Sequence, residues 1–167
     1  LTNLDGLSDL DNLTNVHLRG CSSLTNLNGL SGLTNLNRTK LEGCSSLENF
    51  HGVEGLTATS LDISGCSSLA NLEGLGGLKS LSDLSLEGCS SLTDIGDLEG
   101  CKGLTKLRLE GCSSLANLEG LIGLKNLASL SLRSCSSLTD IGDLEGCKGL
   151  TKLHLEGCSS LANLEGL

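Results

Sequence analysis

The sequence contains no proline, methionine, tryptophan or tyrosine, and Phe50 is its single aromatic residue. A globular core built from 167 residues normally uses aromatic side chains to fill irregular space. A core made almost wholly of leucine instead suits a structure in which the same small space recurs. The chain also lacks a signal peptide and any run of about 18 apolar residues, so we expect no membrane span and no membrane partner.

Positive charge is scarce as well. The chain has 11 Lys and Arg residues and 20 Asp and Glu residues, which gives a net charge of −9. A chain with this balance is repelled by phosphate backbones and by anionic lipid, so nucleic acid is not expected as a partner.

What the chain does contain is a repeat. Cys-Ser-Ser-Leu occurs seven times at spacings of 22 or 23 residues, and leucine or a substitute follows at positions 4, 7, 10, 13, 16, 19 and 21 when the cysteine is position 1. The motif begins at Cys21, Cys44, Cys66, Cys89, Cys112, Cys135 and Cys158. A fixed period of this length indicates a stacked repeat array. We therefore expect one solenoid over residues 1–167, with about seven repeats, as a segment of a longer array.

Two periodicities within each unit predict its local structure. The two-residue step from Leu84 to Leu86 is typical of a short strand. Positions 4 to 16 step by three and usually carry glycine at 9 and 12, which disfavours an α-helix and favours turns or 3₁₀ segments. The expected fold is a mainly β repeat solenoid, with a parallel concave sheet, turn or 3₁₀ return arms and little or no α-helix.

These motifs resemble a known family. Residues 81–92 read L-x-x-L-x-L-x-x-C-x-x-L, which resembles the conserved segment of leucine-rich repeats with cysteine in place of the frequent asparagine. Residues 101–112 and 89–96 resemble the cysteine-containing subclass found in F-box receptors of ubiquitin ligases. The phrase G-C-S-S-L is similar to repeats of plant immune receptors and of kinetoplastid and other protist proteins. The resemblance implies a leucine-rich-repeat solenoid; with no F-box in the chain, it does not imply ubiquitin-ligase function.

The repeats are close copies with few irregularities. Residues 89–111 and 135–157 differ at one position, where Arg108 is replaced by His154. The third unit is one residue shorter, and Thr59 stands where the frame expects leucine. Because the copies are so similar, positions that vary are the candidates for function.

The nine cysteines favour a structural interpretation. Their odd number and the lack of C-x-x-C pairs argue against a disulfide framework or a zinc site. We expect small buried residues with free thiols, each satisfying a backbone group of a turn. Reduced thiols in turn predict an intracellular location, cytoplasmic or nuclear.

Other candidates for chemistry are weak. Acidic side chains recur at Asp94, Asp97 and Glu99 and again at Asp140, Asp143 and Glu145. They follow no EF-hand or β-roll pattern, so a solvated acidic edge is predicted rather than a calcium site.

Histidines are equally unpromising for catalysis. His17 and His154 fall on the sheet many rungs apart, His51 falls on a return arm, and the repeat brings no Ser or Cys near any of them. We expect no catalytic residue, no cofactor and no small-molecule substrate.

Positions 18, 20 and 22 alternate with the buried leucines, so they face outward from the sheet. They hold seven of the 11 basic residues but only six of the 20 acids, which makes this face +1 against −10 elsewhere. We predict a non-catalytic scaffold that binds a protein partner here. The predicted contacts are His17, Arg38, Lys40, Asp62, Asp83, Ser85, Lys106, Arg108, Ser131, Lys152 and His154.

Three alternatives stay open at this point. Long charged side chains on a strand exterior can simply shield the sheet. The paired serines at positions 2 and 3 form hydroxyl ladders, which an ice-binding or adhesive protein could use. The near-identical copies also fit a consensus scaffold made by design, without a native partner.

Overall fold

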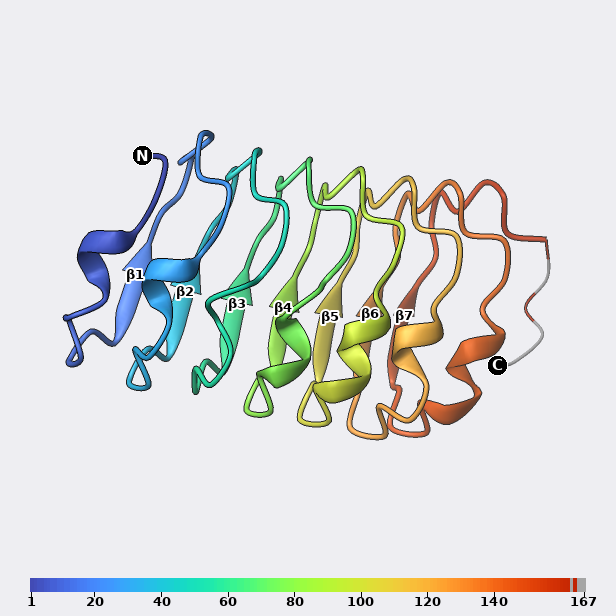
Figure 1. The fold of residues 1–167 in the computed structure, drawn as a ribbon. Coiled ribbons are helices and arrows are strands. Elements are labelled where there is room, and N and C mark those ends of the chain that lie inside the picture. Colours follow the sequence, from blue (N-terminus) through green and yellow to red (C-terminus); the bar gives the residue numbers. More distant parts are fainter. Residues whose placement is uncertain (163, 165–167) are drawn as a thin grey trace.

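The computed structural model describes residues 1–162 and 164, apart from the side chains of Asp97 and Asp143. Each repeat contributes one three-residue strand to a seven-stranded parallel sheet, and Figure 1 shows the strands in chain order between the two ends of the molecule. The strands are β1 (Asn15–His17), β2 (Arg38–Lys40), β3 (Ser60–Asp62), β4 (Asp83–Ser85), β5 (Lys106–Arg108), β6 (Ser129–Ser131) and β7 (Lys152–His154). Neighbouring strands pair at equivalent repeat positions, as Leu84 does with Leu61 and Leu107.

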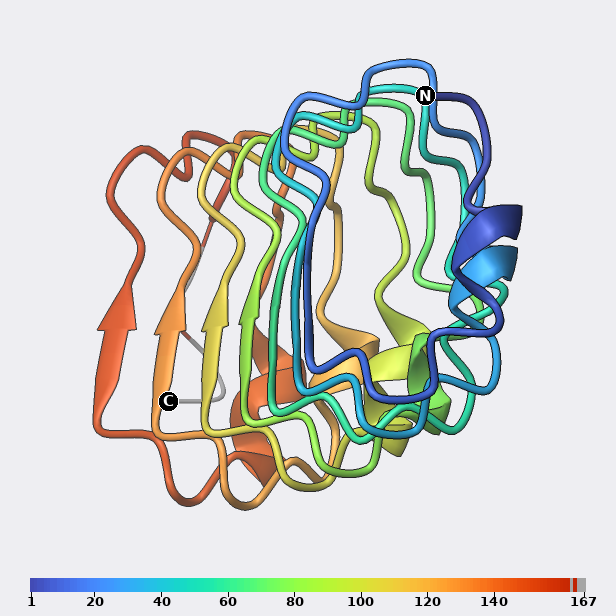
Figure 2. The ribbon, with the colours of Figure 1, turned by 90° about the vertical axis from the view of Figure 1, so that its left-hand side faces the viewer.

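The return arms consist of turns and short 3₁₀ helices, which lie across the rung from the strands in Figure 2. They are η1 (Asp5–Leu7), η2 (Asn28–Leu30), η3 (Leu75–Gly77), η4 (Gly96–Gly100), η5 (Glu119–Leu121) and η6 (Gly142–Gly146). No α-helix occurs in the described part of the chain. The predicted fold, a β solenoid with 3₁₀ arms, is confirmed. Nor does any described helix have the length and apolar character that crossing a bilayer requires.

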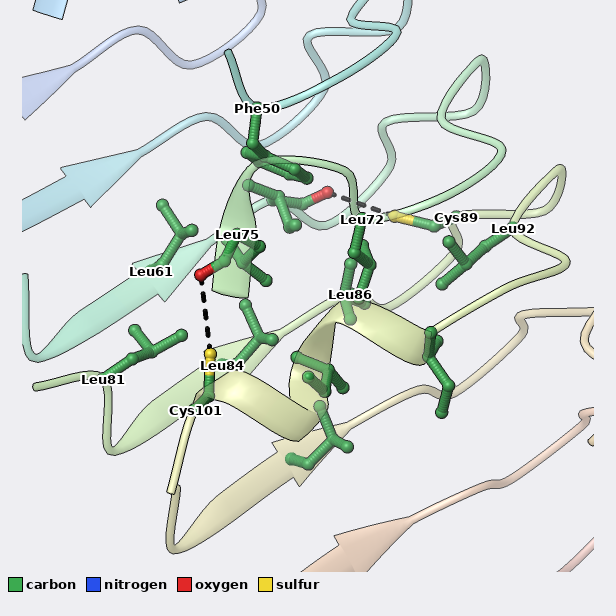
Figure 3. Close-up of a cluster of buried hydrophobic side chains, with 14 of the residues drawn as sticks. Phe50, Leu61, Leu72, Leu75, Leu81, Leu84, Leu86, Cys89, Leu92 and Cys101 are labelled. Carbon is green, nitrogen blue, oxygen red and sulfur yellow. Dashed lines mark hydrogen bonds between the residues drawn. The ribbon is translucent and has the colours of Figure 1, made fainter. Parts of the chain in front are cut away.

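The inward leucines form one core that runs through the rungs (Figure 3). Leu84, Leu107 and Leu130 at the centres of their strands are 0% exposed. Leu153 in the last strand is half-buried, because no described strand lies beyond β7. Each repeat therefore buries its apolar side only through its neighbours, as expected of a solenoid.

The third repeat accommodates its missing residue differently from the predicted alignment. Ala58, rather than Thr59, occupies the leucine place and is 1% exposed. Thr59 lies on the surface, where its hydroxyl donates to the Asn37 side chain at 2.8 Å. Assigning Thr59 to the core was wrong, because the return arm takes up the deletion and the strand register does not change.

Hydroxyl groups just before the strands tie one rung to the next. The Thr105 hydroxyl donates to the Ser82 carbonyl at 2.9 Å, and the Ser82 hydroxyl donates to the Thr59 carbonyl at 3.0 Å. Thr151 makes the same bond to Ala128 at 3.0 Å. These hydroxyls supplement the backbone ladder, so neighbouring rungs are held by polar contacts as well as by leucine packing.

Glycine at position 9 marks a close approach between rungs. A Cβ atom at Gly120 would overlap the carbonyl of Ile95 in the preceding rung, and one at Gly29 would overlap that of Leu4. Gly6 has the same place in the first rung, where nothing lies within 4 Å of the added atom. Backbone proximity between rungs thus leaves no room for a Cβ atom at Gly29 and Gly120, whereas Gly6 has that room.

This difference predicts unequal effects of one substitution. Gly120→Ala is expected to lower the free energy of unfolding by about 1–3 kcal/mol, because two backbones must move apart. Gly6→Ala is the matched control and should change it by less than about 0.5 kcal/mol. Urea unfolding of both variants measures the effect, and equal losses would contradict the close approach.

The turn after each strand needs a left-handed residue, and one repeat places serine there. Ser134 has φ 60°, whereas Gly88 and Gly111 at the same position have φ 72°. A side chain in this region costs about 1 kcal/mol or more. We expect Ser134→Gly to raise the unfolding free energy by about 1 kcal/mol and Gly88→Ser to lower it by a similar amount. Opposite signs in thermal melts are the expected result; a loss in both variants would refute the explanation.

Candidate binding face

The eleven residues predicted to contact a partner all lie in the outward columns of the sheet. They are His17 in β1, Arg38 and Lys40 in β2, Asp62 in β3, Asp83 and Ser85 in β4, Lys106 and Arg108 in β5, Ser131 in β6, and Lys152 and His154 in β7. Positions 18, 20 and 22 of all seven repeats are called the strand face below. The structure brings the eleven residues onto one surface, and their contact with a partner stays a prediction.

Two of these residues contribute little to that surface. Ser85 is 6% exposed and Ser131 is 5% exposed. Each is flanked in register by longer side chains, Ser85 by Asp62 and Arg108, and Ser131 by Arg108 and His154. Long side chains lean over short neighbours on a sheet. The serines therefore form the floor of the strand face, and the charged residues form what a partner would meet.

Charge on the strand face changes sign twice along the solenoid. With histidine neutral, the face carries +2 over β1 and β2, −3 over β3 and β4, and +2 over β5 to β7. The charged residues are Arg19, Arg38, Lys40 and Glu42 in the first basic band, Asp62, Asp83 and Glu87 in the acidic band, and Lys106, Arg108, Glu110, Arg133, Lys152 and Glu156 in the second basic band. The near-neutral total thus conceals three separate patches.

An ion pair joins the acidic band to the second basic band. Asp83 Oδ1 lies 2.8 Å from Arg108 Nη1, and its Oδ2 lies 3.8 Å from Lys106 Nζ. The Asp83 and Arg108 side chains are 35% and 34% exposed, so each such pair stabilises the fold by less than about 1 kcal/mol. Asp83 and Arg108 are therefore already engaged with each other before a partner arrives.

A second cluster, which sequence reasoning missed, centres on Arg133. Its Nη2 lies 2.7 Å from His154 Nδ1, its Nε 3.2 Å from Glu156 Oε2, and its Nη1 3.6 Å from Glu110 Oε1. The backbone N–H of Glu156 and the Arg133 guanidinium lower the pKa of the Glu156 carboxyl. The available signal was the reversal of charge from Glu87 to Arg133 at equivalent places in two copied units.

The strand face is hollowed over β2 to β5. The hollow has a volume of about 240 Å³, and six of the eleven predicted residues line it. Its lining is Arg38, Thr39, Lys40, Ser60, Leu61, Asp62, Asp83, Ser85 and Arg108. It forms where the short side chains of Ser60 and Ser85 lie between longer ones. This is where the strand face offers a partner a concave polar surface.

The thiols act as structural hydrogen-bond donors. Eight of the nine donate to a backbone carbonyl of the preceding rung at 3.0–3.6 Å. Figure 3 shows two of these bonds, from Cys89 to the Ile63 carbonyl and from Cys101 to the Leu75 carbonyl. All nine cysteines are free, as predicted. Each acceptor belongs to the preceding repeat; the Ile63 carbonyl, for example, also accepts the Cys66 N–H within the turn of that repeat.

Burial also makes these thiols poor nucleophiles. It raises the pKa of Cys66, Cys89 and Cys135 to about 12, and it raises the pKa of Cys112 as well. A thiol reacts as its thiolate. At neutral pH these groups are protonated and enclosed, so their chemistry is structural.

The histidines have acidic or basic neighbours instead of nucleophiles. His51 lies between Glu54 at 3.5 Å and Glu73 at 3.9 Å on the return arm, and His154 contacts Arg133. Within the described residues, no His, Cys, Asp and Glu side chains form a group of three suited to a metal ion.

The recurring acids have a local role. Asp94 Oδ1 accepts the Gly96 N–H at 2.7 Å, and Asp140 Oδ1 accepts the Gly142 N–H at 2.9 Å. Both carboxylates therefore stabilise the turn that leads into a 3₁₀ segment. The side chains of Asp97 and Asp143, which belong to the same predicted acidic edge, lie outside the described part of the structure.

Comparison with known proteins agrees with this geometry. A family model described as the leucine-rich-repeat domain of the endo-beta-N-acetylglucosaminidase EndoS matches residues 58–119. Internalin C2 of Listeria monocytogenes superposes with a TM-score of 0.56 and 24% identity, over 96% of this chain and 80% of that one. The leucine-rich-repeat domain of the type III effector XopL gives a TM-score of 0.71 and 20% identity, over 93% of this chain and 64% of that one. A Leptospira interrogans leucine-rich-repeat protein gives 0.50 and 20%, over 99% and 58%.

The structural class of the protein is therefore a solenoid of stacked leucine-rich repeats, with a cysteine at the end of each strand segment. The chain has the fold of leucine-rich-repeat proteins. No curated protein matched the sequence. At these identities the similarity concerns the fold.

Proposed function

We propose that this chain is a non-catalytic protein-interaction scaffold whose partner binds on the strand face. The observation that carries the proposal is the banded charge of that face, +2, −3 and +2, in an array whose other positions are largely copied. A partner with acidic, basic and acidic segments in the same order would be steered and oriented by these bands. The hollow over β2 to β5 adds a concave surface on which such a partner can dock.

The lack of Tyr and Trp bears on the strength of binding. These residues anchor most tight interfaces, and the strand face has neither. Polar and charged contacts would therefore carry the interaction. Its affinity should be moderate and should weaken as salt screens the bands.

The same proposal places the protein inside the cell, in the cytoplasm or nucleus. Eight thiols serve as hydrogen-bond donors, which requires them to stay reduced.

Two double variants test the proposed face, because each of two repeats carries one lysine on the strand face and one on the return arm. Lys106→Glu with Lys152→Glu reverses charge on the strand face. Lys102→Glu with Lys148→Glu makes the same change of net charge on the arm, and all four side chains are exposed. We expect the strand-face variant to bind a saturable partner with about tenfold lower affinity, mainly through a slower association rate. The arm variant should bind that partner like the parent protein.

Partners captured from cell extract over a range of concentrations, and quantified by mass spectrometry, provide the measurement. Matched melting temperatures show that both variants fold. If the arm variant loses the partner while the strand-face variant keeps it, or if neither loses it, the strand face is not the binding surface. Thermal hysteresis without a saturable protein partner would support the ice-binding alternative.

A further inference from the structure

Arg38 is a cation without a counter-ion in the described structure. In the parallel register its strand neighbours are Asn15 on β1 and Ser60 on β3, and both are neutral. Its side chain is exposed at the edge of the hollow. Arg108 on the opposite edge differs, because Asp83 holds it at 2.8 Å. The hollow therefore has one neutralised edge and one edge with an unsatisfied guanidinium.

Lys40 adds a second positive charge to that edge. It is in register with Asp62 on β3, yet the two side chains form no ion pair. Lys40 instead extends along its own strand to Glu42, whose Oε1 lies 3.9 Å from its ammonium group. The contact is long and the Lys40 side chain is 43% exposed, against 19% for Glu42, so the ammonium group is weakly held and can also approach a ligand.

Asp62 is hydrogen-bonded to Ser64, two residues further along the chain, and not to Lys40. The Ser64 hydroxyl donates to Asp62 Oδ1 at 2.7 Å, and the Ser64 N–H donates to the same atom at 3.2 Å. Ser64 is in turn 2.9 Å from the Ser85 hydroxyl. The network fixes one oxygen of Asp62 and leaves the other as an acceptor next to the basic pair.

We propose that Arg38 and Lys40 form a subsite for a carboxylate of the partner, with Asp62 accepting an N–H group beside it. This deepens the proposed function and rests on it. The two basic residues are two apart on one strand, so their Cα atoms lie about 7 Å apart and their side chains leave the same face. A carboxylate between them can take a forked pair of hydrogen bonds from the guanidinium and a charge contact from the ammonium.

Asp62 determines what may follow that carboxylate. A second acid next to it would meet the Asp62 charge and be repelled, whereas a backbone N–H or a basic side chain would be accepted. The subsite therefore selects a segment in which an acidic side chain has a basic residue next to it. The carboxylate proposed for the subsite is that of an Asp or Glu side chain; a C-terminal carboxylate, which no residue follows, is the alternative source that the test distinguishes.

Three pentapeptides distinguish these sources. The first is blocked at both ends and carries Glu followed by Lys, the second has Gln in place of Glu, and the third is the Gln peptide with a free C-terminal carboxylate. Each is titrated into ¹⁵N-labelled protein while the amide signals of β2 and β3 are followed by NMR. We expect the Glu peptide to shift these signals saturably and to bind at least tenfold more tightly than the blocked Gln peptide. Tighter binding of the third peptide instead would assign the subsite to a C-terminal carboxylate.

Substitutions then test which residues hold the carboxylate. Arg38→Gln with Lys40→Gln should weaken the preferred peptide at least tenfold. Lys102→Gln with Lys125→Gln removes the same two charges from the return arm and should leave its affinity within about twofold. Asp62→Asn should reduce the preference for the Glu–Lys peptide over a fourth peptide that has Gln in place of the Lys. Unchanged melting temperatures confirm that these changes leave the fold intact.

The outcomes separate this inference from the function on which it rests. If all three peptides bind alike, or if the Arg38 and Lys40 variant binds as the parent does, the carboxylate subsite is refuted. The Lys106 and Lys152 comparison would then still decide the strand-face proposal by itself. If the acidic peptides shift signals of the return arm and not of β2, both proposals fail.

Discussion

Raising the pH above 9 is expected to destabilise this protein steeply. Burial raises the pKa of the Cys66, Cys89 and Cys135 thiols from 9.0 to about 12 in the folded chain. Between these values the unfolded chain releases thiol protons that the folded chain retains, so the unfolding free energy falls as pH rises. Below pH 9 both states are protonated and the thiols impose no such loss. At one pH unit above 9, each thiol that stays protonated in the folded chain has lowered the unfolding free energy by about 1.4 kcal/mol relative to its value well below pH 9.

Urea unfolding at a series of pH values from 8 to 10 measures this effect. The chain has no tyrosine to titrate in the same range. The triple variant Cys66→Ala, Cys89→Ala and Cys135→Ala should be less stable at pH 8, because it loses three thiol hydrogen bonds. Its stability should nevertheless fall less steeply above pH 9. A parent protein whose unfolding free energy stays level to pH 10 would show that the thiols are not protected as described.

The leucine stripe predicts the other large effect. Leu84→Ala, Leu107→Ala and Leu130→Ala should each lower the unfolding free energy by about 2–5 kcal/mol, since each side chain is 0% exposed between two neighbouring rungs. Leu153→Ala is the matched control in the last strand. Its side chain is half-buried, so its loss should be clearly smaller.

Chemical unfolding monitored by circular dichroism measures these four values. Suppose that the three central substitutions each lower the unfolding free energy by less than about 1 kcal/mol, or by no more than Leu153→Ala does. The packing of the stripe would then be looser than the burial indicates.

Residues 66–111 and 112–157 are two similar copies of a 46-residue pair of repeats, and the copies distribute the charge of the strand face differently. In the first copy Asp83 and Arg108 pair at 2.8 Å, whereas the second has Ser129 and His154 at these places. A positive charge reappears at Arg133, whose guanidinium contacts the His154 ring at 2.7 Å. Both members of the ion pair are thus replaced in the second copy, and the contact between Arg133 and His154 takes the place of that ion pair. Some charges on this face thus serve its own stability, which is why the unpaired Arg38 is the more informative residue for binding.

The periodicity of the sequence by itself determines the architecture of this protein. A step of two residues within a fixed repeat predicts an extended segment with Leu84 and Leu86 on its inner side, and β4 includes Leu84. Stacking near-identical units aligns Leu84 with Leu61 and Leu107. The same argument placed the outward columns, and with them the candidate face. These features follow from backbone geometry, which is the same in every rung.

Tertiary structure decided how individual side chains are used. Sequence position cannot tell that Asp62 turns to Ser64 and not to Lys40, or that Ser131 is covered by its neighbours. The sequence pattern also placed Thr59 in the core, although Ala58 is the buried residue. Contacts between rungs hold the strand register, so the missing residue is taken up in the return arm. The physical reason is common to all three. Repeat spacing sets the face on which a side chain lies, whereas its partners depend on the length and charge of residues one rung away, 22 or 23 positions distant in the chain.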